Sequence, residues 1–216
     1  MTPPPGLAAA LRLVVILDPG ASSGRDLADL ATHAIAGGAT MLQVRGKQLG
    51  AADLAALIRR ILTVAGEVPV IVNDRFDVAL ATRAAGCHLG QDDFPIAEAR
   101  VHAPAGFILG GSAGTPQEAG RCVEQGAHYI GIGPIHATPS KSDAGSAIGV
   151  AGFARVHAAS PSLPAVAIGS VTARDAAALR AAGAAGLAVI SAVAGAADPE
   201  RAARELRAAF DSASPP

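Results

Sequence analysis

The chain has 216 residues, of which half are hydrophobic and 16% charged, and its formal net charge is −1. This length suits a single domain with a sizeable core, and the balanced charge, without a basic block or an acidic tail, argues against nucleic acid as a partner. The apolar runs are too short to span a bilayer, and the two cysteines offer neither a disulfide framework nor metal-ligand spacing, so we expect a reduced, cytoplasmic protein without a membrane partner.

Short apolar runs rich in Val, Ile and Leu alternate with alanine-rich helical segments along the whole chain. Strands of this nearly continuous hydrophobic kind are expected where both faces of a parallel sheet are covered. Eight such units favour a single-domain TIM (β/α)8 barrel over residues 1–216, with residues 1–10 and 212–216 as frayed termini, although a doubly wound sheet with fewer strands stays open. In chain order, the expected strands are Leu13–Leu17, Met41–Val44, Val68–Val72, Cys87–Leu89, Phe107–Leu109, Tyr129–Ile132, Ala165–Ile168 and Gly186–Ile190. The expected helices are Arg25–Ala36, Ala51–Val64, Asp77–Ala84, Ile96–His102, Pro116–Gln125, Val150–Ala158, Ala173–Ala182 and Pro199–Phe210.

Glycine marks the junction between several expected helices and the strands that follow them. Gly38, Gly86, Gly126 and Gly183 each stand at the end of a helix and lead directly into a strand. We expect these glycines to provide left-handed helix caps and tight turns at the lower rim of the barrel.

Unusual polar residues recur where the expected strands end, which is where a barrel of this kind carries its chemistry. The chain has only two lysines, Lys47 and Lys141, and one asparagine, Asn73, against fifteen arginines. All three rare residues follow expected strands, which indicates that these positions require those side chains. The other polar residues at strand ends are Gln43, Arg45, Asp74, Arg75, Gln91, Asp92, Asp93, Ser112, His136, Thr138, Ser140, Ser170 and Ser191.

Two carboxylates from adjacent strands, Asp74 and Asp93, are placed to converge on one hard cation. Magnesium is usually held by one or two carboxylates together with substrate phosphate oxygens and water. Arg45, Lys47 and Lys141 would add positive charge around that ion, as a diphosphate requires. The residues therefore indicate a magnesium-diphosphate half of the rim.

A second half of the rim follows the last two expected strands. The pairs Gly169-Ser170 and Ile190-Ser191 precede helices, and backbone N–H groups at such turns commonly hold a terminal phosphate in this fold. Two phosphorylated substrates, or one long one, are implied.

Each of these residues also has a purely structural interpretation. Asp74 and Arg75 could form a solvated ion pair, Asp93 could be a helix-start residue, and Ser112 could be a helix cap. His88 lies on a strand, where a hydrogen-bonded core histidine is the more common case. The joint placement on one rim is what favours a functional site.

Six segments resemble the motifs of one known family. They are QVRGK at 43–47, IVNDRFDVAL at 71–80, CHLGQDD at 87–93, YIGIGP at 129–134, TPSK at 138–141 and AVISA at 188–192. They occur in order from the first strand to the final helix, and their combination resembles the thiamine phosphate synthases.

The resemblance implies a transferase that joins two phosphorylated precursors and releases pyrophosphate. The precursors are 4-amino-2-methyl-5-(diphosphooxymethyl)pyrimidine and 4-methyl-5-(2-phosphooxyethyl)thiazole. The C–O bond to the diphosphate would break first, leaving a carbocation that the thiazole nitrogen captures, with one Mg²⁺ per subunit. The implied magnesium ligands are Asp74 and Asp93, and the implied catalytic residues are Arg45, Lys47, Ser112 and Lys141. The pyrimidine diphosphate would contact Gln43, Arg45, Lys47, Asn73, Ser112 and Lys141, and the thiazole phosphate would contact Thr138, Pro139, Ser140, Gly169, Ser170, Ile190 and Ser191.

The chain departs from the family pattern at three positions, which leaves two other functions open. Gly46 replaces a usually acidic residue, Ser170 replaces the second glycine of a phosphate turn, and Gly114 stands where histidine is common. The alternatives are an aminothiazole tautomerase-like barrel, against which the retained metal and diphosphate ligands argue, and a non-catalytic paralogue that binds thiamine precursors. The oligomeric state stays open, although many barrels are dimers.

Overall fold

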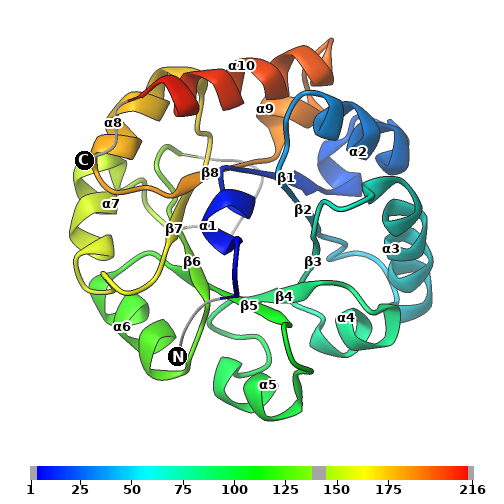
Figure 1. Cartoon of the computed structure of the whole chain (residues 1–216), viewed down its shortest axis with the longest axis horizontal. Helices are drawn as coiled ribbons and strands as arrows, with labels where there is room; N and C mark the ends of the chain where they lie inside the picture. Colours follow the sequence, from blue (N-terminus) through cyan, green and yellow to red (C-terminus); the bar gives the residue numbers. More distant parts are fainter. Residues whose placement is uncertain (1–3, 138–144, 214–216) are drawn as a thin grey trace.

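A closed parallel barrel forms the body of the protein. The computed structural model describes residues 4–137 and 145–213. Within these residues the strands pair in chain order and β8 pairs with β1, so the sheet has no free edge, as Figure 1 shows down the barrel. The expected TIM barrel is confirmed, because a doubly wound sheet would stay open. The strands are β1 (Leu13–Leu17), β2 (Met41–Val44), β3 (Val70–Asn73), β4 (Gly86–Leu89), β5 (Ile108–Ala113), β6 (Tyr129–Ile132), β7 (Ala165–Ile168) and β8 (Gly186–Val189).

Helices form a ring around the barrel and cover its outer face (Figure 1). None of the helices in the described part of the chain is long and apolar enough to cross a membrane. The α-helices are α1 (Leu7–Ala10), α2 (Leu27–Ala36), α3 (Ala51–Ala65), α4 (Phe76–Thr82), α5 (Ile96–His102), α6 (Pro116–Glu124), α7 (Gly149–His157), α8 (Ala176–Ala181), α9 (Ser191–Ala194) and α10 (Pro199–Ser212), and the 3-10 helices are η1 (Pro19–Ala21) and η2 (Ala173–Asp175).

The strands bury both of their faces, in two separate hydrophobic cores. Along β1, Leu13, Val15 and Leu17 point outward and join the core between the strands and the helices. Val14 and Ile16 point inward and join the smaller core inside the barrel. Successive side chains of a strand point to opposite faces, which is why an uninterrupted hydrophobic run such as LVVIL serves both cores.

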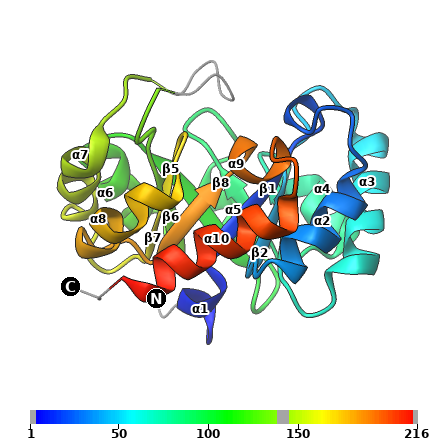
Figure 2. The same ribbon diagram turned by 90° about the horizontal axis from the view of Figure 1, so that it is seen from above.

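The N-terminal segment closes the bottom of the barrel. Residues 1–10 were expected to fray, but Leu7–Ala10 form α1, which lies across the barrel mouth in Figure 1 and below the strands in Figure 2. Leu7 and Leu11 are 3% and 0% exposed and pack in the interior core. Burial of these two leucines orders a segment too short to form a stable helix alone. At the other terminus, α10 extends to Ser212.

Element boundaries differ from the expectations where glycine is involved. Gly38, Gly126 and Gly183 adopt left-handed conformations, with φ of 99°, 80° and 93°, as expected. Gly86 does not, because it is the first residue of β4, and Arg83, with φ of 55°, caps α4 instead. A Cβ on Gly86 would stand 2.1 Å from the backbone oxygen of Ile108, so this glycine permits close packing of two strands.

The other boundaries differ by two residues or fewer, and two elements differ more. β5 was expected to end at Leu109 but continues to Ala113, since its Gly-Gly-Ser-Ala end pairs with β6. The expected helix Ala173–Ala182 divides into the 3-10 turn η2 and α8.

Candidate active site

A cavity of about 670 Å³ opens at the C-terminal ends of the strands. This volume lies within the range of small-molecule sites. Every candidate residue of the described part of the chain lines it, whereas Thr138, Pro139, Ser140 and Lys141 lie outside the described residues. The candidates that line the cavity are Gln43, Arg45, Lys47, Asn73, Asp74, Asp93, Ser112, Gly169, Ser170, Ile190 and Ser191.

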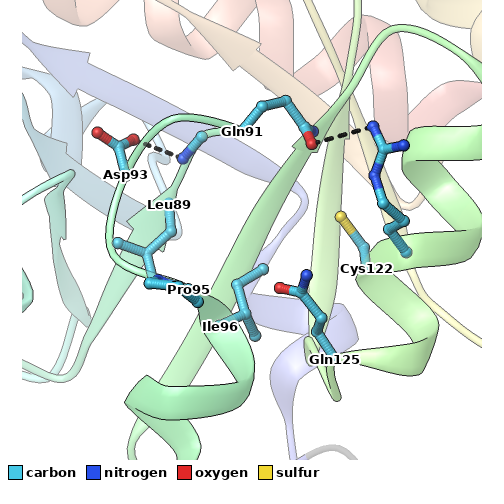
Figure 3. A pocket seen from close by; sticks show the side chains of 9 residues that line it. Leu89, Gln91, Asp93, Pro95, Ile96, Cys122 and Gln125 are labelled. Atoms are coloured by element: carbon cyan, nitrogen blue, oxygen red, sulfur yellow. Dashed lines mark hydrogen bonds between the residues drawn. The ribbon is translucent and has the colours of Figure 1, made fainter.

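The acidic pair lies where β3 and β4 end. Asp74 has a φ of 65°, and its backbone N–H donates to the backbone oxygen of His88 at 2.8 Å, which fixes its position beside β4. Asp93 is held in turn by Gly90, whose backbone N–H donates to Oδ2 at 2.6 Å (Figure 3). The two carboxyl groups hydrogen-bond each other, and burial, together with Asp93, raises the pKa of Asp74 to about 6.

Cationic side chains stand next to this pair. Lys47 and Arg45 both act to lower the pKa of Asp74, against the larger effects of burial and Asp93. Arg45 is itself ion-paired with Asp18, and their side chains are 13% and 11% exposed. Asp18 directly follows β1 and also accepts a hydrogen bond from the backbone N–H of Gly20 at 2.8 Å. Asp18 was not among the expected site residues, although its place directly after a strand was a usable signal.

Carboxylates outnumber cations in the described lining of the cavity. A diphosphate entering this lining would be repelled unless a cation intervened, and two adjacent carboxylates are hard oxygen ligands suited to Mg²⁺. Among the described residues no group of three or more His, Cys, Asp or Glu could hold a metal ion. The carboxylates are Asp74, Asp92, Asp93 and Glu118, and the cations are Arg45 and Lys47.

The opposite side of the cavity is formed by the turns after β7 and β8. Gly169 has a φ of 99°, and a Cβ there would stand 2.6 Å from the Cα of Pro134. Ser170 also adopts a left-handed conformation, with a φ of 49°, and its hydroxyl donates to the backbone oxygen of Ala137 at 3.0 Å. Gly169 and Ser170 together form the turn that follows β7 at this end of the cavity.

Four polar side chains connect across the floor of the cavity. Tyr129 hydrogen-bonds Gln43, and its hydroxyl lies 3.1 Å from Nδ1 of His88. Nε2 of His88 lies 3.0 Å from Oγ of Ser112. His88 is thus a hydrogen-bonded, buried histidine, as its strand position suggested, but it also lines the cavity. Tyr129 was not expected in the site, because a tyrosine at the start of a hydrophobic strand is indistinguishable from a core residue in the sequence.

The structure settles one of the structural interpretations. Arg75 pairs with Asp77 at 2.6 Å, so Asp74 keeps its carboxylate for the cavity.

At two of the three departures from the expected motifs, neighbouring atoms leave little room for a side chain. A Cβ on Gly46 would stand 2.9 Å from Leu54, and a Cβ on Gly114 would stand 3.2 Å from the backbone oxygen of Gly133.

A smaller cavity of about 110 Å³ lies beside the main one, between the loop that follows β4 and helix α6 (Figure 3). Gln91 is at its rim and donates from Nε2 to the backbone oxygen of Ser112 at 2.6 Å, while Arg121 donates to Oε1 of Gln91 at 3.5 Å. These contacts attach the loop that carries Asp93 to the strand that carries Ser112.

Comparisons with known proteins agree on one family. The family model described as thiamine monophosphate synthase matches residues 13–193. Thiamine-phosphate synthases from Methanoculleus marisnigri and Moorella thermoacetica are 48% and 47% identical, and each alignment covers 90% of this chain and 93% of the relative. Among solved structures, a thiamine phosphate pyrophosphorylase from Pyrococcus furiosus superposes with a TM-score of 0.86 at 34% identity, covering 95% of this chain and 98% of that one. A 3-hexulose-6-phosphate synthase, at 21% identity and a TM-score of 0.68, shares the fold alone.

Proposed function

The chain belongs to the thiamine monophosphate synthase family, and is thus a transferase of thiamine biosynthesis, and we propose the following substrates and chemistry for it. It joins the pyrimidine of 4-amino-2-methyl-5-(diphosphooxymethyl)pyrimidine to 4-methyl-5-(2-phosphooxyethyl)thiazole and releases pyrophosphate. The observation that carries this proposal is the division of one cavity into an acidic and cationic half at Asp74, Asp93, Arg45 and Lys47 and a phosphate-turn half at Gly169-Ser170.

The acidic half would take the diphosphate together with Mg²⁺. Asp74 and Asp93 would hold the ion, which when bound supplies charge neutralisation for the leaving diphosphate. Arg45 and Lys47 would stabilise the same charge from the protein, with Lys141 contributing from outside the described residues. The proximity of the two carboxyl groups supports this assignment, because two adjacent carboxylates repel each other and a cation bound between them would relieve that repulsion.

Neutral side chains would align the pyrimidine. Gln43, buried on β2, and Asn73, the last residue of β3, face the cavity without adding charge, which suits recognition of a ring that becomes a carbocation. Ser112 would donate to the diphosphate. A dissociative reaction needs no general base, since the attacking thiazole nitrogen carries no proton to be removed.

The turns after β7 and β8 would hold the thiazole phosphate. Gly169, Ser170, Ile190 and Ser191 line this end of the cavity, and Thr138, Pro139 and Ser140 would complete the contact. The thiazole ring would then lie between its phosphate and the pyrimidine, so that the two reacting atoms meet in the interior of the cavity.

Pyrophosphate release from the purified protein tests the proposal. The assay supplies both substrates, each alone, and both with a chelator in place of magnesium, and compares the unchanged chain with Asp74→Asn. Asparagine is preferred to alanine as the replacement because asparagine tolerates the left-handed backbone conformation of Asp74. We expect release that needs both substrates and magnesium and falls by more than about 100-fold in Asp74→Asn.

Three results would contradict parts of this proposal. Release with the pyrimidine substrate alone would mean hydrolysis rather than transfer. Release that is indifferent to the chelator would remove magnesium from the mechanism. Full activity in Asp74→Asn, with the magnesium dependence unchanged, would move the metal away from the acidic pair.

A further inference from the structure

The four polar side chains on the cavity floor form a continuous chain of hydrogen bonds from β2 to β5. The contacts run from Gln43 to Tyr129, from Tyr129 to Nδ1 of His88 at 3.1 Å, and from Nε2 of His88 to Oγ of Ser112 at 3.0 Å. Tyr129 is 1% exposed, and Gln43 and His88 are 5% and 9% exposed. Buried polar groups of this kind polarise one another, so the orientation of one fixes the orientation of the next.

The barrel interior makes room for this chain of side chains. His88 pairs in register with Gly110 on β5, and Gly110 pairs with Tyr129 on β6, so the histidine and the tyrosine face each other across a glycine. A Cβ on Gly110 would stand 2.3 Å from the Tyr129 ring and 2.6 Å from Nδ1 of His88. Gly110 is therefore required for the contact between His88 and Tyr129.

The ring nitrogens of His88 donate or accept according to the tautomer, so the distances allow the chain to run in two directions. Burial raises the pKa of Tyr129, so the phenol keeps its proton and has one hydrogen to donate. In one direction the phenol donates to the Gln43 carbonyl oxygen; in the other the Gln43 amide donates to the phenolic oxygen, and the tyrosine hydroxyl donates to Nδ1 of His88. A neutral imidazole carries one proton, which in this second direction lies on Nε2, directed at Oγ of Ser112.

The direction of the chain decides what Ser112 offers to a ligand. When its oxygen accepts from His88, its hydroxyl hydrogen can turn into the cavity. In the reverse direction Ser112 would donate to His88 and present only lone pairs to an anion, which would repel it. We propose that His88 and Tyr129 are positioning residues that orient the Ser112 hydroxyl as a donor to the departing diphosphate. This inference rests on the proposed function for the identity of that anion.

The test combines kinetics with nitrogen NMR. Tyr129→Phe removes the donor to His88 and keeps the aromatic ring, so kcat should fall about tenfold while KM for both substrates stays within about twofold. In a Ser112→Ala background the same substitution should have no further effect. Independently of activity, ¹⁵N spectra of the unsubstituted, ligand-free protein should show His88 protonated at Nε2 alone, and Tyr129→Phe should show a mixture of both tautomers.

Thr82→Val is the matched control, since it removes another buried hydroxyl, one that donates to the backbone oxygen of Val78 at 2.8 Å on α4. It should leave kcat and the His88 spectrum unchanged. A wild-type His88 protonated at Nδ1 would reverse the chain and overturn the inference, even if Tyr129→Phe did not fold. An equal loss of kcat with and without Ser112 would do the same. If instead the wild-type protein released no pyrophosphate, the proposed function would fail while the NMR result still decided the direction of the chain.

Discussion

Asp74 lines the cavity, and its position there lowers the stability of the protein. Its carboxyl group is partly buried against Asp93, which raises its pKa to about 6, so above neutral pH the metal-free protein holds two charged carboxylates in contact. We expect Asp74→Asn to raise the free energy of unfolding by about 1 kcal/mol in the presence of a chelator, because the repulsion is removed and asparagine accepts the left-handed backbone. Urea denaturation measures this. Asp92→Asn, at the neighbouring exposed carboxylate, is the control and should change stability by less than about 0.5 kcal/mol. If Asp74→Asn instead lowered the free energy of unfolding, the Asp74 carboxyl group would contribute net stability and the expected repulsion would be contradicted.

Ser170 presents a similar balance between strain and bonding. Its φ of 49° is unfavourable for a residue with a Cβ, and its hydroxyl is bonded to the Ala137 backbone oxygen. Ser170→Ala removes the hydrogen bond and keeps the unfavourable backbone conformation, whereas Ser170→Gly removes the hydrogen bond and relieves the backbone strain. We therefore expect the glycine variant to be more stable than the alanine variant by about 1 kcal/mol in urea denaturation. Equal stabilities would mean that the turn relaxes when the hydroxyl is removed.

At the scale of secondary structure, the contact between β4 and β5 depends on one glycine. A Cβ on Gly86 would stand 2.1 Å from the backbone oxygen of Ile108, and backbone cannot move aside as a flexible side chain can. Gly86→Ala should cost more than about 3 kcal/mol of unfolding free energy. Gly120, on α6, has no atom within 4 Å of a Cβ, so Gly120→Ala should instead stabilise the protein by up to about 1 kcal/mol. Urea denaturation measures both variants. Changes of opposite sign in the free energy of unfolding would confirm that the room available for a Cβ decides the effect, and similar changes would contradict it.

For the molecule as a whole, residues that stabilise the fold lie at the lower end of the barrel, and the cavity lies at the upper end. Helix α1 lies below the strands in Figure 2, and its Leu7 is 3% exposed and packs in the interior core. Leu7→Ala should destabilise the protein by about 3 kcal/mol and leave KM for both substrates unchanged. Val101→Ala, at a side chain that is 78% exposed, is the control and should be within about 0.5 kcal/mol of the original. A changed KM in Leu7→Ala would show that the two ends of the barrel are coupled.

Much of the architecture could be predicted from hydrophobic patterning, and the misses have physical causes. β5 was expected to stop before Gly110, since glycine disfavours strands in isolation, yet the pairing with β6 continues through Ser112. α1 was not expected, because its four residues are helical only when Leu7 is buried under the barrel.

Hydrophobic patterning alone was enough to predict a parallel α/β protein and to predict which polar residues share a rim. Parallel strands place all their C-terminal ends at the same edge, so residues after strands, such as Asp74, Asp93 and Ser170, are brought together whatever the detailed packing. The closure of β8 onto β1, the ion pair of Asp18 with Arg45, and the contacts of His88 with Tyr129 and Ser112 became visible in the folded barrel. Contacts across the barrel depend on the stagger of the strands and on which side chains face inward, and these are set by the simultaneous packing of the whole sheet rather than by any local pattern.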